Sequence, residues 1–239
     1  MRVAIVSDIH GNRTAFEAVL ADLRQASPDL VLHGGDLADS GSSPIEIVDT
    51  IRSLGWHGVA GNTDQMLASP ETLEVFASHS PQMTSLWDAL REMAACTREQ
   101  LGEGRLAWLR ALPLAQSSSV FALMHASPGD PWHAPALNAS DAELISVYGD
   151  LSQSMVIYGH IHRPYVRRLP GITVVNTGSV GQSHDGDRRA CYLLLDGKQL
   201  EHRRVEYDVD KELHLLVASG MPHADWIART LTHAAPQMP

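Results

Sequence analysis

The sequence is poor in cysteine, in positive charge and in long apolar runs, and each shortage excludes a class of protein. Only Cys96 and Cys191 are present among 239 residues, which is too few for a disulfide framework or a sulfur-ligand site. Lys and Arg number 18 against 28 Asp and Glu, and this net charge of −10 disfavours binding to extended nucleic acid or membranes through bulk positive charge. No run approaches the roughly 20 apolar residues of a membrane-spanning helix, and no cleavable signal pattern precedes the first apolar run. These absences predict a cytoplasmic protein.

Histidine, in contrast, is abundant. The chain has 13 histidines beside its 28 carboxylates, and 44% of its residues are hydrophobic, which is enough to bury a core. Disordered and fibrous classes are therefore excluded. Imidazoles together with so many carboxylates suggest metal ligation, although composition alone does not establish it.

The first 62 residues alternate short apolar runs with helical patterns, which is typical of βαβ units around a buried sheet. We predict strands at residues 2–7, 30–33 and 56–60, and helices at 14–26 and 44–54. Thr14 with Glu17 and Ser43 with Glu46 have the spacing of a helix-capping box. Because ligands bind beyond the carboxyl ends of strands in open α/β sheets, we expect the chemistry in the loops after these strands.

Only helical patterns follow from residue 64 to about 114, and we interpret residues 65–115 as a helical lid or insertion. Later patterns predict strands at 119–124, 155–158, 165–169, 172–175, 190–195 and 200–207. Helices are predicted after Ser140, which forms a capping box with Glu143, and at 210–218 and 224–232. No repeat or low-complexity linker divides the chain, so residues 1–239 are expected to form a single α/β domain.

Five short segments place metal-type ligands at the end of a predicted strand or in the loop after it: Asp8-Ile9-His10, Gly34-Gly35-Asp36, Gly61-Asn62-Thr63-Asp64, His125 and Gly159-His160-Ile161-His162. Residues two apart at a strand end project to the same side, so Asp8 and His10 can chelate one centre. The same spacing applies to His160 and His162. Mixed imidazole and carboxylate ligands suit Mn, Fe or Zn better than Ca or Mg. A lone histidine such as His125 is more often structural, and only the other four segments make it a candidate ligand.

In this order, these segments resemble the calcineurin-like metallophosphoesterase superfamily, whose pattern is D-x-H, G-D-x, G-N-x-[DE], a lone H and G-H-x-H. The similarity extends from residue 1 to about 195. Segments 176–181 and 185–187 are also similar to those that follow G-H-x-H in the small bacterial phosphodiesterase-like branch. The resemblance implies a four-layer α/β/β/α sandwich of two mixed β-sheets, and two divalent metal ions. It implies that one ion is held by Asp8, His10 and His162, the other by Asn62, His125 and His160, and both by Asp36.

The resemblance further implies hydrolysis of a small phosphodiester or phosphomonoester, by attack of a hydroxide that bridges the two ions. The candidate catalytic residues are Asp36, Asn62, His125 and His160, and manganese is the metal most expected to support activity. Two divalent ions add about +4 at the site, so an acidic chain can still attract a small phosphate ester. The alternative is a non-catalytic protein-binding scaffold with the same fold. Such scaffolds tend to have damaged ligand sets, whereas all seven positions are filled here.

One position departs from the family pattern. Many members have a histidine at the third position of G-N-x-[DE], where it is thought to protonate the leaving group, and this chain has Thr63 there. A hydroxyl cannot act as an acid near neutral pH as an imidazole can, so we expect substrates with good leaving groups, such as aryl phosphodiesters or nucleotides. The departure weighs against the protein-phosphatase and dinucleoside-polyphosphate hydrolase branches. The neighbouring Asp64 either orients a group near the site or caps the following helix, and His133 and His184 lie in loops that can border the cleft.

Overall fold

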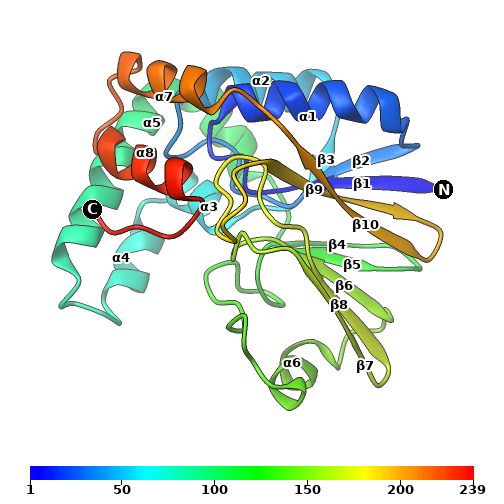
Figure 1. Ribbon diagram of the computed structural model, residues 1–239. Coiled ribbons are helices and arrows are strands. Elements are labelled where there is room, and N and C mark those ends of the chain that lie inside the picture. The colour runs from blue at the N-terminus through cyan, green and yellow to red at the C-terminus, as the bar shows by residue number, and fades with distance from the viewer.

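The chain folds around two five-stranded β-sheets in the computed structural model, which describes residues 1–239 (Figure 1). The first sheet contains, in spatial order, β10 (Gln199–Val205), β9 (Ala190–Asp196), β1 (Arg2–Val6), β2 (Leu30–His33) and β3 (His57–Gly58). The second contains β4 (Ala115–Ser117), β5 (Ala122–Met124), β6 (Met155–Tyr158), β8 (Ile172–Asn176) and β7 (Tyr165–Leu169). The helices are α1 (Arg13–Ala26), α2 (Pro44–Ser53), α3 (Asn62–Ala68), α4 (Glu71–Ala77), α5 (Thr84–Arg110), α6 (Asp141–Tyr148), α7 (Val209–Ala218) and α8 (Ala224–His233).

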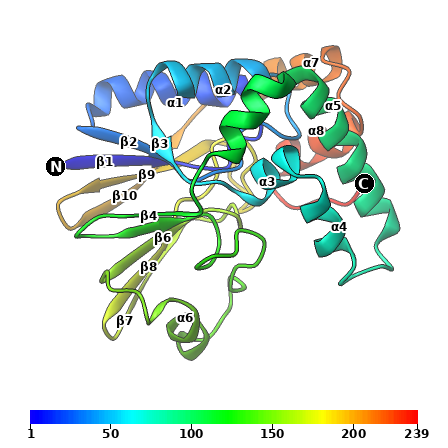
Figure 2. The same cartoon turned by 180° about the vertical axis from the view of Figure 1, so that it is seen from behind.

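Both sheets are mixed. Strands β1, β2 and β3 run parallel in the first sheet, and β9 is antiparallel to β1. In the second sheet β5, β6 and β8 run parallel, and β4 and β7 pair antiparallel at its two edges. The loops after the parallel strands leave both sheets on the side where α3, α5 and α8 lie (Figures 1 and 2).

The two sheets pack face to face because their apolar residues alternate along the strands. On β1, Val3 and Ile5 point into a core between the sheets, where they join Leu123 of β5 and Ile157 of β6. The intervening residues of β1 point the other way and pack under α1 and α2. On the far side, α6 covers the outer face of the second sheet. These layers confirm the predicted α/β/β/α sandwich.

Helices α5, α7 and α8 form a further cluster beyond the strand ends. Met93 of α5 packs against Leu216 of α7 and against Ile227 and Leu231 of α8. Most of the segment 65–115 is helical, as predicted, and comprises α4, α5 and residues 65–68 of α3. None of the helices is both long and apolar enough to cross a bilayer.

The element boundaries show where local sequence patterns were misleading. The strand predicted at residues 56–60 is only two residues long, and β4 was not predicted. Helix α1 is capped by Asn12, whose Oδ1 accepts the backbone N–H of Ala15 at 2.9 Å. The capping box predicted for Thr14 is therefore wrong, and its partner Glu17 pairs instead with Arg13.

The other two predicted capping boxes had opposite outcomes. Ser43 makes no capping hydrogen bond to α2, so that box is also wrong. The box of Ser140 and Glu143 at α6 is confirmed, because each side chain accepts the backbone N–H of the other residue. Spacing alone could not distinguish these cases, because each box also depends on competing partners in the folded chain.

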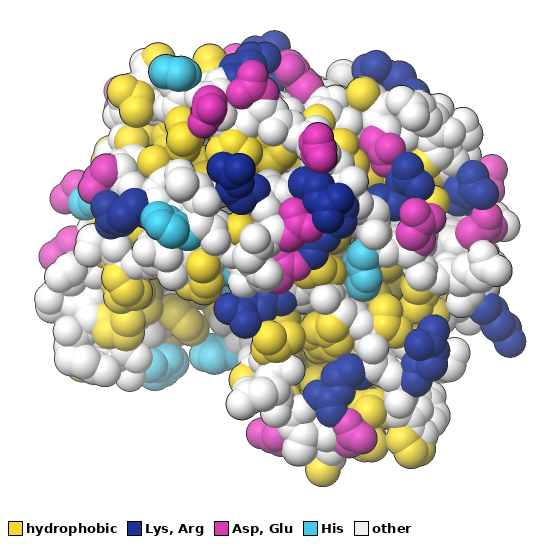
Figure 3. Space-filling view, in the orientation of Figure 1, with side chains coloured by type: hydrophobic (Ala, Val, Ile, Leu, Met, Phe, Trp, Pro, Cys, Tyr) yellow, Lys and Arg dark blue, Asp and Glu magenta, His cyan; other side chains and the backbone are white.

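Acidic and basic side chains are interspersed over the face shown in Figure 3. One pair joins α1 to the first sheet. Arg203 of β10 donates two hydrogen bonds to Asp22 of α1, at 2.8 and 2.9 Å, and Tyr192 of β9 donates a third, at 2.7 Å. The guanidinium, aided by the Tyr192 hydroxyl, holds the pKa of Asp22 below its ordinary value.

We expect Asp22→Asn to lower the free energy of unfolding by about 1 kcal/mol at pH 7, because an amide cannot form the charge-assisted pair. Since the folded-state pKa of Asp22 is lowered, its stabilisation is complete above the unfolded value of about 3.9 and is lost as the pH falls through the folded value. Urea unfolding of both proteins at neutral and acid pH should show the difference shrinking with acidification. Asp150→Asn, at an exposed carboxyl group, should show no such difference.

Candidate metal centre

All seven predicted ligand side chains come together in one buried cluster. The ligands follow the carboxyl ends of five strands, β1, β2, β3, β5 and β6. After β3 the ligand is Asn62, the first residue of α3, and after the other four strands the ligands lie in loops. Five of the seven residues are buried, and the other two are half-buried. The members of the cluster are Asp8, His10, Asp36, Asn62, His125, His160 and His162.

One group of donor atoms combines the β1 and β6 loops. The Nε2 atom of His162 lies 3.2 Å from Asp8 Oδ1 and 3.2 Å from the Nε2 atom of His10. Donor atoms of these three residues all lie within 4.8 Å of one another. This is the trio predicted to share one ion.

The second group surrounds His125. Its Nε2 atom lies 3.0 Å from Asn62 Oδ1 and 3.5 Å from Asp36 Oδ2, and the same Asn62 oxygen lies 2.9 Å from His160 Nδ1. Asp36 Oδ2 is also 3.6 Å from His10 Nε2, so this carboxylate lies between the two groups. Asp8 approaches the second group as well, with Oδ1 4.0 Å from His125 Nε2.

Backbone carbonyl groups orient three of the four imidazoles. His10, His125 and His162 each place Nδ1 against a carbonyl oxygen, which makes Nδ1 the N–H donor and leaves Nε2 facing the cluster. The acceptors are, in that order, Asp39 (3.3 Å), Gly34 (2.8 Å) and Gln182 (2.6 Å). Metal-bound histidines in proteins are generally oriented in this way.

The backbone at the cluster has an unusual conformation. Five of the seven residues have a positive φ, a left-handed conformation that is unfavourable for side chains with a Cβ atom. They are Asp8 (55°), His10 (49°), Asp36 (54°), His160 (65°) and His162 (55°). Such a concentration of strained residues is characteristic of a functional site.

The charges of the cluster are those of a cation site. Burial opposes ionisation of Asp8 and Asp36, but neighbouring imidazoles outweigh it and lower the pKa of both carboxyl groups. Burial opposes protonation of His125 too, but Asp36 and Asp8 raise its pKa to about 10. Burial lowers the pKa of His10 and of His160 to about 4, so both are neutral at pH 7.

The donor set therefore fits divalent metal ions. The Nε2 atoms of His10 and His162 face each other at 3.2 Å, and a cation bound between them would satisfy both. Two carboxylates, one amide oxygen and four imidazole nitrogens are a mixed set that suits Mn, Fe or Zn.

Asp64 fixes the loop that carries Asp36. Its carboxylate accepts the backbone N–H groups of Asp36 (2.8 Å), Leu37 (3.1 Å) and Gly61 (2.9 Å). Asp64 thus orients the neighbouring loop, which is one of the two roles considered from the sequence. It is not the N-cap of α3, because the N-cap is Gly61 and Asp64 is the third residue of the helix, where its carboxylate accepts the N–H of Gly61.

The turn at residues 176–181 supports the β1 and β6 loops from beneath. Asn176 donates to the carbonyl group of Gly159, and Gly181 donates to the carbonyl group of Asp8 at 2.9 Å. A Cβ atom on Gly181 would overlap the carbonyl oxygen of Ile9, which lies between two candidate ligands.

A cavity of about 220 Å³ opens onto the cluster. His184 lines this cavity, with its ring centroid 4.3 Å from that of His162, whereas His133 does not line it. The wall opposite the ligands was not predicted, and it comes from α5, α8 and the residues after α8: Leu90, Met93, Trp226, Ile227, Thr230, Pro236 and Gln237. No sequence signal identifies this wall, because its position depends on how α5 and α8 pack.

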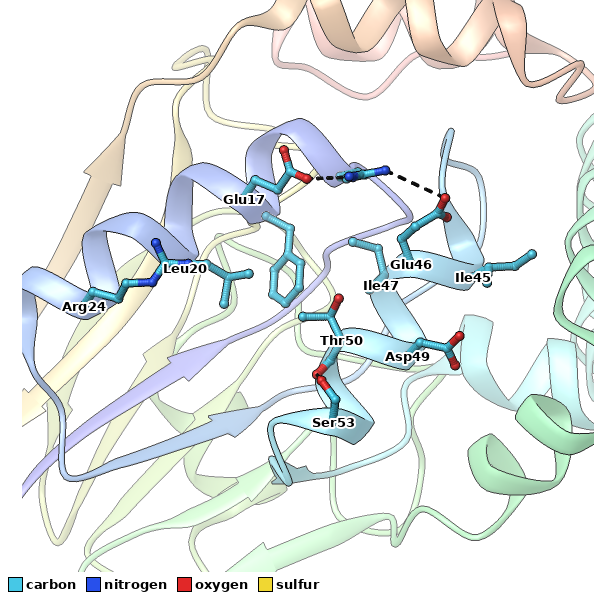
Figure 4. Close-up of a pocket in the computed structure, with 11 residues that line it drawn as sticks. Glu17, Leu20, Arg24, Ile45, Glu46, Ile47, Asp49, Thr50 and Ser53 are labelled. Atoms are coloured by element: carbon cyan, nitrogen blue, oxygen red, sulfur yellow. Dashed lines mark hydrogen bonds and ion pairs between the residues drawn. The ribbon is translucent and has the colours of Figure 1, made fainter.

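A larger cavity of about 800 Å³ lies elsewhere, between α1 and α2 (Figure 4). Arg13 at this cavity contacts both Glu17 (2.6 Å) and Glu46 (3.8 Å). None of the seven clustered side chains lines it. The chemistry therefore points to the smaller cavity.

The fold is shared with a solved metallophosphoesterase structure. The family model of the calcineurin-like phosphoesterase superfamily domain matches residues 1–199, and the chain belongs to this superfamily. Membership supports hydrolysis of phosphate esters as the class of reaction, and it confirms the resemblance noted in the sequence.

Three similar proteins show how far the likeness extends. An uncharacterised protein of Methanocaldococcus jannaschii is 29% identical over 250 residues, covering 96% of each chain. A symmetrical bis(5'-nucleosyl)-tetraphosphatase of Methylococcus capsulatus is 27% identical over 157 residues, covering 64% of this chain and 53% of that protein. The crystal structure of a metallophosphoesterase from Sphaerobacter thermophilus superimposes with a TM-score of 0.82 at 24% identity, covering 98% of this chain and all of that one.

We expect Gly181→Ala to lower the free energy of unfolding by about 2–3 kcal/mol and to weaken Mn²⁺ binding, because the new methyl group displaces the loop between Asp8 and His10. Urea unfolding and calorimetric titration with Mn²⁺ measure the two effects. Gly104→Ala is the matched control, since a Cβ atom there meets no neighbour and should stabilise α5 by up to about 1 kcal/mol. Equal stability of the two variants would contradict the supporting role of the turn.

Proposed function

We propose that this chain is a metal-dependent phosphoesterase that hydrolyses a small phosphodiester or phosphomonoester at the seven-residue cluster. The observation that carries the proposal is the convergence of four imidazoles, two carboxylates and one amide in a buried cluster at the end of a cavity. Superfamily membership supports the reaction class.

The residues divide into the roles that the resemblance implies. Asp8, His10 and His162 would hold one divalent ion, and Asn62, His125 and His160 the other. Asp36, which lies between the groups, would hold both. Two such ions supply Lewis-acid stabilisation of the phosphoryl oxygens and lower the pKa of the attacking water.

Groups of the protein position the ester at this centre. The Oδ1 atom of Asn62 faces His125 and His160, which leaves its amide N–H group free to donate to a phosphoryl oxygen. The hydroxyl group of Thr63 is buried without a hydrogen-bond partner and lines the same cavity. We propose that it donates to an oxygen of the bound ester, since a buried hydroxyl otherwise loses its hydrogen bond to water.

We also propose that the segment 65–115 acts as a lid within a single domain. Its helix α5 contributes Leu90 and Met93 to the cavity wall, and α5 has a break at Gly102, where φ is 68° and ψ is 165°. These contacts support the proposed lid, because they bring α5 to the cavity that the candidate ligands also line.

We expect hydrolysis of para-nitrophenyl phosphate or its bis(para-nitrophenyl) diester to require added Mn²⁺. In Asp36→Asn and in His160→Ala, kcat/KM should fall at least about 100-fold, because each variant removes a metal ligand. His214→Ala, which removes an exposed histidine of α7, should retain full activity. If the Mn²⁺-loaded protein hydrolyses neither ester but binds a protein partner, the non-catalytic scaffold is the correct alternative.

A second test concerns the leaving group. We expect Thr63→His to raise the ratio of kcat/KM for an alkyl phosphate ester to kcat/KM for the para-nitrophenyl ester at least about tenfold, because only the alkoxide leaving group needs an acid. Steady-state kinetics on both esters measure this split. An equal effect on the two esters would contradict the inferred lack of a leaving-group acid.

A further inference from the structure

The cavity has two chemically different walls. One wall carries the candidate ligands, and the opposite wall is largely apolar, with Leu90 and Met93 from α5 and Trp226 and Ile227 from α8. No Lys or Arg side chain lines the cavity. Within the cavity the positive charge available to a bound anion would therefore lie at the ligand wall, and a second phosphate group held inside the cavity would meet no Lys or Arg side chain.

Residues 234–239, which we call the strap, complete the apolar wall. The strap follows α8 and runs past α3 (Figure 1). Pro236 and Gln237 line the cavity together with the ligand residues. The strap thus borders the same space that an ester bound at the metal centre would occupy.

Hydrogen bonds hold the strap against its surroundings. Gly186 donates its backbone N–H to the carbonyl group of Ala234 at 2.9 Å. The indole Nε1–H of Trp226 donates to the carbonyl group of Gln237 at 2.8 Å, and Arg229 donates to the carbonyl group of Met238 at 3.0 Å. Trp226 therefore lines the cavity and also fixes the strap.

From these observations we infer that the α8 helix and the strap form a specificity wall, which selects esters with a single phosphoryl group and a compact apolar or aromatic alcohol group. The inference rests on the proposed function. The phosphoryl group lies at the ligand wall, and the alcohol group packs against Trp226, Ile227 and the strap. The cavity of about 220 Å³ is smaller than the roughly 300–1,000 Å³ of pockets that enclose drug-sized ligands, so it cannot enclose a dinucleoside polyphosphate.

Binding measurements test this wall independently of turnover. We expect the Mn²⁺-loaded full chain to bind phenylphosphonate about tenfold more tightly than inorganic phosphate by calorimetry, because only the phosphonate carries an apolar group. Tripolyphosphate should bind no more tightly than phosphate. Removal of residues 235–239 keeps the Ala234 contact but takes away the strap wall, and it should abolish most of the phenyl preference.

Two point variants keep the test decisive if the shortened chain does not fold. Trp226→Phe retains an aromatic ring but loses the hydrogen bond to Gln237, and should reduce the phenyl preference severalfold. Trp132→Phe is the matched control, since it loses an indole hydrogen bond to Gln65, 3.0 Å long, outside the cavity. It should leave the preference unchanged. Thermal melts and Mn²⁺ stoichiometry report whether each variant is folded and loaded.

Kinetics then separate this inference from the proposed function. For the full chain, kcat/KM should be higher for para-nitrophenyl phosphate than for diadenosine tetraphosphate. Removal of residues 235–239 should lower the ratio of these two kcat/KM values about tenfold. Equal binding of phenylphosphonate and phosphate by the full chain would overturn the specificity wall. A phenyl preference that survives both the removal of residues 235–239 and Trp226→Phe would also overturn it. A phenyl preference without hydrolysis of any ester would overturn the proposed function and leave the wall supported.

Discussion

The structure depends on two carboxylates that are buried close to the same imidazole. Asp8 and Asp36 both approach His125, and burial would drive each toward its neutral form if no positive charge were near. The four imidazoles, held by a strained backbone, supply nitrogen ligands for a cation that would balance these negative charges. Two buried negative charges cost free energy unless nearby positive charge balances them. Divalent ions bound by this donor set would supply that positive charge.

The two-sheet architecture explains how ligands from the ends of five strands come together around these carboxylates. Parallel strands in both sheets end on the same side, so residues distant in sequence converge without long connections. The left-handed residues redirect the chain directly after the strands, and Gly181 allows the supporting turn to approach the Asp8 loop closely. Apolar side chains of α5 and α8 line the cavity that opens onto this cluster.

The sequence predicted the candidate ligands well because each lies next to a strand end, where local pattern and position in space are directly linked. The pairing of His10 with His162 came from the resemblance to the superfamily, because spacing alone paired His160 with His162, and these two histidines lie in different groups of the cluster. The sequence could not predict the strap or Trp226 as parts of the cavity, because their positions follow from the packing of Met93 against α7 and α8 across more than 100 residues. Capping was predicted poorly at Thr14 for a related reason, since the neighbouring Asn12 forms the cap instead.

We propose that the cluster holds two divalent ions bridged by one carboxylate. Electron paramagnetic resonance during titration of the metal-free protein with Mn²⁺ tests it most directly. We expect saturation at two Mn²⁺ ions per chain, with an exchange-coupled spectrum once both are bound. Saturation at one ion, or two ions with uncoupled six-line spectra, would contradict it.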